Sequence, residues 1–182
     1  MLRSYLHKEF VMAKFGNSII KGLEVSEIIA VLNRAYADEW LAHYQYFIEA
    51  KVVKGIMKDA AIFELNQHAA DELRHATMVA DRIIQLGGTP LLNPKEWFTH
   101  TRCGYEEPKD FDVVRILQDS IKGEQCAISV YSELVDMTRD KDIVTYDIVS
   151  QILADEVGHE EDLQALHDDI TEFVKELKKS LA

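Results

Sequence analysis

Two five-residue segments of the sequence share one pattern of acidic residues and histidine. Asp71-Glu72-Leu73-Arg74-His75 and Asp155-Glu156-Val157-Gly158-His159 both read D-E-x-x-H. On a helix, Glu and His three positions apart lie on one face about one turn apart, so both side chains can reach a common cation. A single pair of this kind is common in proteins, so the repetition is the informative feature.

A glutamate lies upstream of each segment at nearly the same distance. Glu39 is 33 residues before Glu72, and Glu124 is 32 residues before Glu156. Corresponding residues of the two halves are therefore 84 or 85 positions apart. The chain thus contains a pair of helices twice, with the polar residues of the two copies in register.

Four carboxylates that face an apolar core need compensating charge, because a lone buried charge is strongly unfavourable. Two divalent cations would balance them, with one imidazole and one terminal carboxylate on each ion and the other carboxylates shared. Oxygen and imidazole ligands suit iron or manganese, and zinc can occupy the same site. The predicted ligands are Glu39, Glu72, His75, Glu124, Glu156 and His159. The alternative, a set of buried polar residues that satisfy one another, lacks basic partners on these faces.

The aspartate before each motif glutamate has an expected supporting role. Metal-bound imidazoles usually donate their other N–H to a carboxylate. We expect Asp71 and Asp155 each to orient the histidine of the opposite helical pair. A solvated aspartate on the flank of the helix is the alternative.

Four long segments have the apolar periodicity of helices and must position these residues. They span about 25–54, 58–86, 112–139 and 142–177. Each apolar stripe is interrupted near its middle by an inward-facing carboxylate. Tyr46 and Tyr131 fall on the same stripes and are expected to pack there. His43 and His68 share the faces of predicted ligands, and we interpret them as packing residues or as part of a path for iron.

Connection lengths predict the topology. The short connections around Gly55 and residues 139–141 indicate two antiparallel hairpins. Residues 87–111 are numerous enough to run the whole length of the bundle, and Asn93-Pro94 is typical of the start of a short helix. We therefore predict one all-α domain, an antiparallel four-helix bundle with a long crossover, after an N-terminal extension of about residues 1–23.

Composition excludes some functions. A formal net charge of −12 disfavours binding to nucleic acid, which requires Lys and Arg to neutralise phosphates. No run of 18 apolar residues predicts a membrane span, and charged residues interrupt the apolar stretches of the first 20 residues, so no signal peptide is expected. The cytoplasm is the expected location.

The motifs resemble those of the ferritin-like superfamily from Val25 onward. Glu39 within Ala37-Asp38-Glu39-Trp40, both D-E-x-x-H segments and Glu124 are similar to the bacterioferritin set of di-iron ligands, all within one chain. Cys103 and Cys126, with 22 residues between them, resemble the cysteine pair of the Dps-like thioferritins. The resemblance implies two iron ions per chain, oxidation of Fe²⁺ with hydrogen peroxide or O₂, ferric storage in a homo-oligomeric cage of twelve subunits, and protection against oxidative stress.

The role of the cysteines has two interpretations. Cys126 lies about 200° around the helix from Glu124, so it should flank the metal site rather than bind the metal. The two cysteines form either a redox pair, by disulfide formation or by protection against over-oxidation, or two buried thiols that pack as apolar residues. The resemblance favours the redox pair.

Other functions remain open at the same ligands. A rubrerythrin-like peroxidase or a manganese catalase would turn over peroxide without storing mineral, although the sequence has no C-x-x-C pair for a rubredoxin-type iron. A protein that compacts DNA is the alternative of another class, and the acidic composition argues against it.

Overall fold

The structure is a computed structural model that describes residues 14–181, and the predicted all-α fold is confirmed. In this part of the chain the one element other than helix and turn is an isolated bridge between Lys54 and Asp112. The predicted extension, residues 1–23, lies partly outside the described residues. The helices are α1 (Lys14–Asn17), α2 (Val25–Val52), α3 (Lys58–Gln85), α4 (Pro94–His100), α5 (Val113–Thr138) and α6 (Ile143–Ser180).

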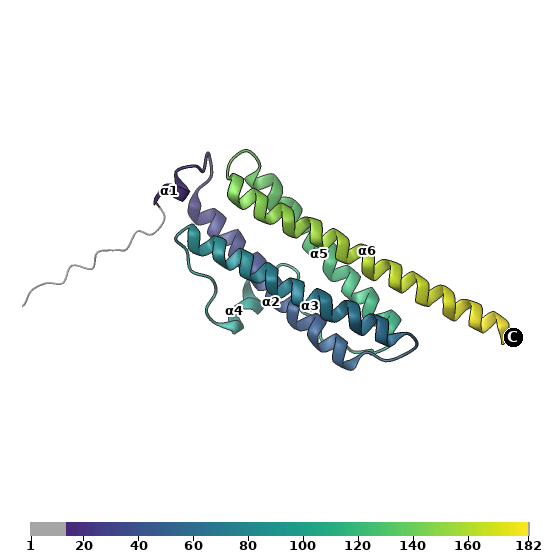
Figure 1. Ribbon diagram of the computed structural model, residues 1–182. Coiled ribbons are helices and arrows are strands. Elements are labelled where there is room, and N and C mark those ends of the chain that lie inside the picture. The colour runs from purple at the N-terminus through teal and green to yellow at the C-terminus, as the bar shows by residue number, and fades with distance from the viewer. Residues whose placement is uncertain (1–13, 182) are drawn as a thin grey trace, which may run out of the picture.

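The four long helices form a bundle of two hairpins, as the connection lengths predict. Figure 1 shows α2 and α3 as one antiparallel pair and α5 and α6 as the other. The crossover between α3 and α5 runs back along the bundle and carries α4 beside α2. Because of this connection, α3 lies antiparallel to α6, and α2 lies antiparallel to α5.

Helix termini follow the capping chemistry of the sequence. The side chains of Asn93, Asp112 and Asp142 precede α4, α5 and α6 and accept hydrogen bonds from backbone N–H groups of the first turn. Gly87 follows α3 with φ of 86°, a left-handed conformation in which glycine avoids the strain of a side chain. These signals fix the register of the helices relative to their connections.

Side chains attach the crossover to the bundle. One carboxylate oxygen of Asp38 accepts hydrogen bonds from the Thr101 hydroxyl and from the backbone N–H groups of Arg102 (2.8 Å) and Cys103 (3.0 Å). Cys103 is joined to Cys126 of α5 by a disulfide. The crossover is therefore fixed to both hairpins at one level of the bundle.

Two further contacts hold the same segment. The indole of Trp97 in α4 stacks on Trp40 of α2, with ring centroids 5.0 Å apart. At the far end, the backbone of Lys54 donates to the carbonyl of Phe111 and accepts from the N–H of Val113, at 2.7 and 2.8 Å. The crossover is therefore attached to the first hairpin in its middle, through Trp97, and at its end, through Lys54.

A polar layer divides the core into two apolar clusters. One cluster includes Ile28, Leu32, Val79, Ile83, Leu134 and Ile152. The other includes Leu65, Ile116, Leu117, Leu163 and Ile170. Such packing on both sides positions the polar side chains between rigid helices.

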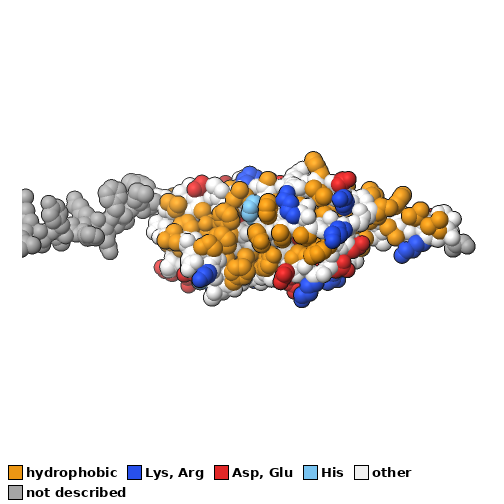
Figure 2. Space-filling view, turned by 90° about the horizontal axis from the view of Figure 1, so that it is seen from below, with side chains coloured by type: hydrophobic (Ala, Val, Ile, Leu, Met, Phe, Trp, Pro, Cys, Tyr) orange, Lys and Arg blue, Asp and Glu red, His pale blue; other side chains and the backbone are white. Residues whose placement is uncertain are grey.

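Helix α6 extends beyond its neighbours (Figure 1). Phe173 and Leu177, which the periodicity assigns to the apolar face, are 48% and 43% exposed, because the bundle ends before them. Hydrophobic side chains also gather over much of the face drawn in Figure 2. None of the described helices combines the length and the apolar character that a membrane span needs.

Candidate metal centre

The structure brings the six predicted ligands together in the polar layer, and all six are buried. Each long helix contributes at its middle. Glu39 comes from α2, Glu72 and His75 from α3, Glu124 from α5, and Glu156 and His159 from α6.

Three carboxylates surround one ring nitrogen of His75. Its Nδ1 lies 3.1 Å from Glu156 Oε1, 3.2 Å from Glu72 Oε2 and 3.5 Å from Glu39 Oε2. Ligand atoms of these four residues all lie within 4.8 Å of one another. They can therefore surround a single cation.

The second group is arranged in the same way around His159. Its Nδ1 lies 3.4 Å from Glu72 Oε1, 3.4 Å from Glu156 Oε2 and 3.6 Å from Glu124 Oε1. Glu72 and Glu156 thus direct one oxygen toward each histidine. Glu72 and Glu156 would therefore be shared between two bound cations, and Glu39 and Glu124 would each contact one of them.

The donor set fits a pair of cations. Two ligands on one ion, each about 2.1 Å away, are about 3.0–3.4 Å apart at octahedral or tetrahedral angles, close to the distances above. Five buried atoms of the set have no hydrogen-bond partner among the described residues: Glu39 Oε2, Glu72 Oε1, both carboxylate oxygens of Glu156, and His159 Nδ1. Buried polar atoms are rarely unpaired, and bound cations would satisfy these five.

Burial and close carboxylates shape the titration of the site. Burial raises the pKa of Glu124 to about 7, although His159 opposes the shift. Burial lowers the pKa of His159, but the close carboxylates of Glu124, Glu156 and Glu72 outweigh it and raise the pKa to about 12. Burial also lowers the pKa of His75, but the carboxylates of Glu156, Glu39 and Glu72 outweigh it and raise the pKa. The carboxylates therefore favour positive charge at this position, whether the imidazoles or a bound cation carry it.

Asp155 and Asp71 lie behind the imidazoles, and each is on the opposite hairpin from its histidine. Asp155 Oδ2 is 3.2 Å from Nε2 of His75, within hydrogen-bond distance. Asp71 Oδ2 is 3.6 Å from Nε2 of His159, which is longer than a hydrogen bond. Arg74 joins the two aspartates, because its Nη2 lies 3.0 Å from Asp71 and 2.9 Å from Asp155.

Arg74 was missed by sequence reasoning because the two motifs differ at this position. The residue before the second motif histidine is Gly158, so the repeat gave no matching signal. In the structure, one guanidinium serves the aspartates of both motifs.

Two tyrosines do more than pack. The Tyr46 hydroxyl donates a hydrogen bond to Glu124, and the Tyr131 hydroxyl donates one to Glu39. Each tyrosine thus reaches across from its own hairpin to the terminal carboxylate of the other. Tyr46 and Tyr131 are 85 positions apart, the same offset as Glu39 and Glu124, and this regularity of the sequence was the available signal.

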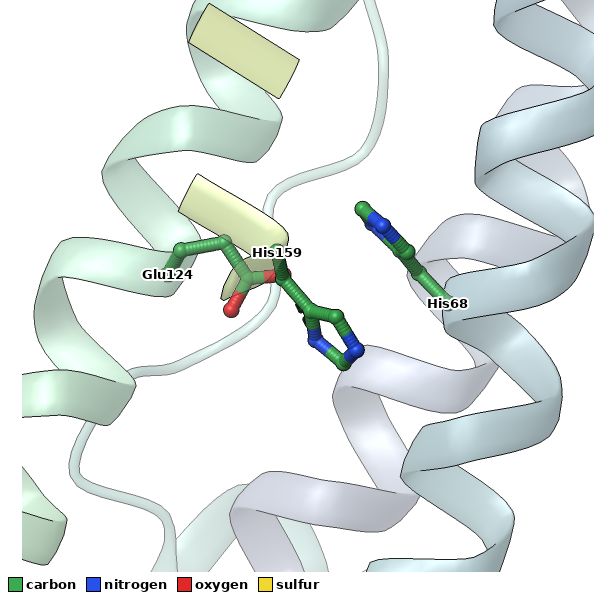
Figure 3. Close-up of side chains that lie close together, drawn as sticks. All are labelled: His68, Glu124 and His159. Atoms are coloured by element: carbon green, nitrogen blue, oxygen red, sulfur yellow. Dashed lines mark ion pairs between the residues drawn. The ribbon is translucent and has the colours of Figure 1, made fainter. Parts of the chain in front are cut away.

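The two histidines near the site differ. His43 Nδ1 lies 2.6 Å from the carbonyl oxygen of Ala69, which gives it a packing partner outside the centre. His68 is fully buried and stacks on His159, with ring centroids 4.1 Å apart. Figure 3 shows His68 extending from α3 toward His159, with Glu124 reaching in from α5. Burial lowers the pKa of His68 to about 4.

A cavity of about 430 Å³ leads to the ligands from the side of the crossover. Its lining includes Glu39, Glu124 and both residues of the Cys103–Cys126 disulfide. The cysteines therefore border the route to the site without belonging to either group of candidate ligands. A cavity of this size admits small molecules.

Comparisons with known proteins identify the family of the chain. The profile of the ferritin-like domain family matches residues 29–173. The chain is 30% identical over 151 residues to the DNA protection during starvation protein of Pyrococcus furiosus, which covers 76% of both chains. It is 34% identical over 136 residues to a bacterioferritin of Streptomyces coelicolor, covering 73% of this chain and 75% of that one.

A solved structure gives the same result. The dodecameric thioferritin of Bacteroides fragilis, a bacterioferritin-related protein, superposes with a TM-score of 0.85 at 42% identity. The match covers 90% of this chain and 96% of that one. With its bundle of two hairpins and its paired carboxylate–histidine groups, the chain belongs to the ferritin-like family.

Proposed function

We propose that this protein oxidises Fe²⁺ at the paired site and stores the ferric product, with hydrogen peroxide or O₂ as the oxidant. The observation that carries the proposal is the sharing of Glu72 and Glu156 between the two histidine groups. Membership of the ferritin-like family supports iron as the cation. The similarity to proteins of this family also supports a role in iron storage and in protection against oxidative stress. Manganese and zinc suit the same ligands.

Six residues would hold the two ions. Glu39 and His75 serve one position, Glu124 and His159 serve the other, and Glu72 and Glu156 bridge them. When bound, a pair of ferrous ions supplies two electrons, which with two protons reduce one hydrogen peroxide to two water molecules.

The surrounding residues position these ligands. The hydroxyls of Tyr46 and Tyr131 fix the terminal carboxylates, and Asp155 holds the His75 ring. We propose the same orienting role for Asp71 at His159. Because the ligands are buried between two apolar clusters, their charges are weakly screened and strongly attract cations.

The disulfide and the assembly belong to the same proposal. We propose that Cys103 and Cys126, which both line the cavity, are a redox pair. In the thiol form they would give two electrons and two protons to one hydrogen peroxide, which leaves the disulfide and two water molecules. A homo-oligomeric cage of twelve subunits is supported by the dodecameric thioferritin. Three exposed aromatic residues, Tyr44, Phe47 and Phe98, form ring contacts with one another or with the half-buried Tyr105. Such a patch is suited to burial between subunits. The cytoplasm stays the expected location.

Stopped-flow absorbance after loading with Fe²⁺ tests the activity. We expect rapid ferric signals that saturate near two irons per chain when peroxide or O₂ is mixed with the loaded protein. Glu124→Gln and His159→Ala should abolish the rapid phase, and Glu27→Gln, an exposed change on α2, should not. Oxidation no faster than in buffer with both oxidants would refute the proposal.

Two alternatives are separated by further measurements. A di-metal peroxidase or catalase would consume peroxide over many cycles without accumulating iron beyond about two per chain, so iron-loading capacity distinguishes it from storage. A protein that compacts DNA would retard plasmid in a gel at low salt. We expect no retardation, because the formal net charge of the chain is −12.

A further inference from the structure

His68 is a buried histidine without a hydrogen-bond partner for either ring nitrogen among the described residues. Its ring stacks on His159 at 4.1 Å and meets Tyr46 edge-on at 5.5 Å between centroids. Buried polar groups in folded proteins are nearly always paired, so two nitrogens without a partner in the described chain are available to bind an ion.

Two carboxylates lie on the outer side of this ring. Glu64 is one turn before His68 on α3, and its Oε2 is 4.0 Å from Nε2 of His68. Asp162 is exposed on α6, one turn after His159. Ligand atoms of Glu64, His68 and Asp162 all lie within 4.8 Å of one another. Two atoms on opposite sides of one transition-metal ion are about 4.2 Å apart, so small side-chain adjustments complete such a site.

The charge of this pair of carboxylates is uncompensated. Within residues 14–181, no Lys or Arg forms an ion pair with Glu64 or Asp162. Two like charges beside an unpaired imidazole favour a divalent cation.

The inner side of the same ring faces the paired site. Ligand atoms of His68, Glu124 and His159 also lie within 4.8 Å of one another (Figure 3). Glu64 lies one turn before His68 on α3, and Asp162 lies one turn after His159 on α6. Because these helices are antiparallel, both carboxylates lie toward the same end of the bundle. His68 is the member common to both groups.

The internal repeat shows that this arrangement is specific to one side of the molecule. At the 84-residue offset that relates the two motifs, Glu64, His68 and Asp162 correspond to Ile148, Ile152 and Met78. These three residues belong to, or pack against, the apolar cluster at the other side. One side of the paired site is therefore closed by apolar residues, and the equivalent positions on the other side all have metal-binding side chains.

We propose that Glu64, His68 and Asp162 form a third cation site, for a divalent transition metal, from which the ion passes to the His159 side of the paired site. Carboxylate and imidazole ligands suit Fe²⁺, and Zn²⁺ and Co²⁺ can report on the same ligands. The transfer step rests on the proposed function, whereas the binding of a third cation does not.

Equilibrium titration of the metal-free full-length protein with Co²⁺ tests the site, followed by absorbance and by metal analysis. We expect about three ions per wild-type chain and about two in the Glu64→Gln/Asp162→Asn variant. The matched control is Asp81→Asn/Glu161→Gln, which removes the same charge from exposed positions on the same helices and should retain about three. Equal stoichiometry in the variant and the wild type would overturn the proposal.

A second variant and a rate measurement separate the binding of the third cation from its transfer to the paired site. His68→Phe keeps the ring stack and removes both nitrogens, and should also bind one ion fewer, with circular dichroism verifying its fold. With Fe²⁺ and peroxide, Glu64→Gln/Asp162→Asn should slow the rapid phase several-fold while the signal still saturates near two irons per chain. An unchanged rate would overturn the transfer step. Loss of one Co²⁺ in a protein without any ferrous oxidation would refute the proposed function and retain the third site.

Discussion

The Tyr131 hydroxyl of α5 donates a hydrogen bond to Glu39 of α2, so each hairpin supplies a donor for the terminal carboxylate of the other. Tyr131→Phe removes this donor and leaves the buried carboxylate short of a partner. We expect the variant to lose about 1–3 kcal/mol of unfolding free energy in the metal-free protein. Urea unfolding followed by circular dichroism measures the loss.

The exposed Tyr44 supplies the control for this change. Tyr44→Phe should leave the unfolding free energy within about 0.5 kcal/mol of the wild type. A Tyr131→Phe variant as stable as the Tyr44→Phe variant would show that Glu39 does not depend on the hydroxyl.

The sharing of carboxylates predicts different losses of metal for bridging and terminal ligands. Glu72→Gln removes a ligand from both positions and should reduce Co²⁺ binding by about two ions per chain. Glu39→Gln affects one position and should reduce binding by about one. The same loss in both variants would contradict the bridging role, and Glu27→Gln serves as the unaffected control.

A buried carboxyl away from the candidate ligands predicts a dependence of stability on pH. Burial raises the pKa of Glu49 from 4.5 to about 7, against hydrogen bonds from Gln45 and Ser120. The folded state therefore favours the protonated carboxyl, and this contribution is present in full below pH 4.5 and is lost as the pH rises through about 7.

Glutamine does not ionise, so the Glu49→Gln variant should not lose this stability as the pH rises. The variant should be more stable than the wild type at pH 8, by on the order of 2–3 kcal/mol, and the difference should nearly vanish at pH 4.5. The Ser120 hydroxyl already lies 3.0 Å from the Ile116 carbonyl oxygen, so it can donate there and accept from the new amide. Thermal unfolding at both pH values measures the change, and a difference that does not depend on pH would refute this assignment.

A buried ion pair fixes α3 to the start of α6. Arg82 Nη2 lies 2.9 and 2.8 Å from the two carboxylate oxygens of Asp142, and both side chains are buried. Asp142→Asn should cost about 3–5 kcal/mol, because it leaves the guanidinium without its counter-charge. The exposed pair of Arg139 and Asp136 is the control, and Asp136→Asn should change stability by less than about 1 kcal/mol.

The disulfide predicts a contribution to stability that is separate from metal binding. It closes a loop with 22 residues between Cys103 and Cys126, so the double change to serine should cost about 2–4 kcal/mol. Because the cysteines lie outside the candidate ligand groups, Co²⁺ stoichiometry should not change. Unfolding in urea with and without reductant measures the first effect, and metal analysis measures the second.

The fold was predictable because apolar stripes and connection lengths determine which helices pair. Long stripes with few breakers specify four helices, and the length of the 87–111 segment allows one topology of two hairpins. Periodicity does not show where neighbouring helices end, so Phe173 and Leu177 continue the apolar stripe of α6 although they lie beyond the core.

The sequence predicts the part of the candidate site that the internal repeat contains. Six residues recur at offsets of 84 or 85, and the structure places them in one layer. Tyr46 and Tyr131 obey the same rule, but tyrosine on an apolar stripe gives no sign of whether its hydroxyl has a partner. Arg74 and His68 break the symmetry, and such residues are recognised only when the opposite hairpin is in place.

Residues 104–110 connect the last anchor of the crossover to the start of α5, and several of them line the cavity. This segment contains no helix, contributes no candidate ligand and is held at both ends, by Asp38 near Cys103 and by the backbone of Lys54 near Phe111. Under the proposed function, exchanges in this segment would alter which molecules enter and would leave the candidate ligands in place. The stretch that borders the entrance and the helices that carry the candidate ligands are separate in the sequence, so the first can be varied without changing the second.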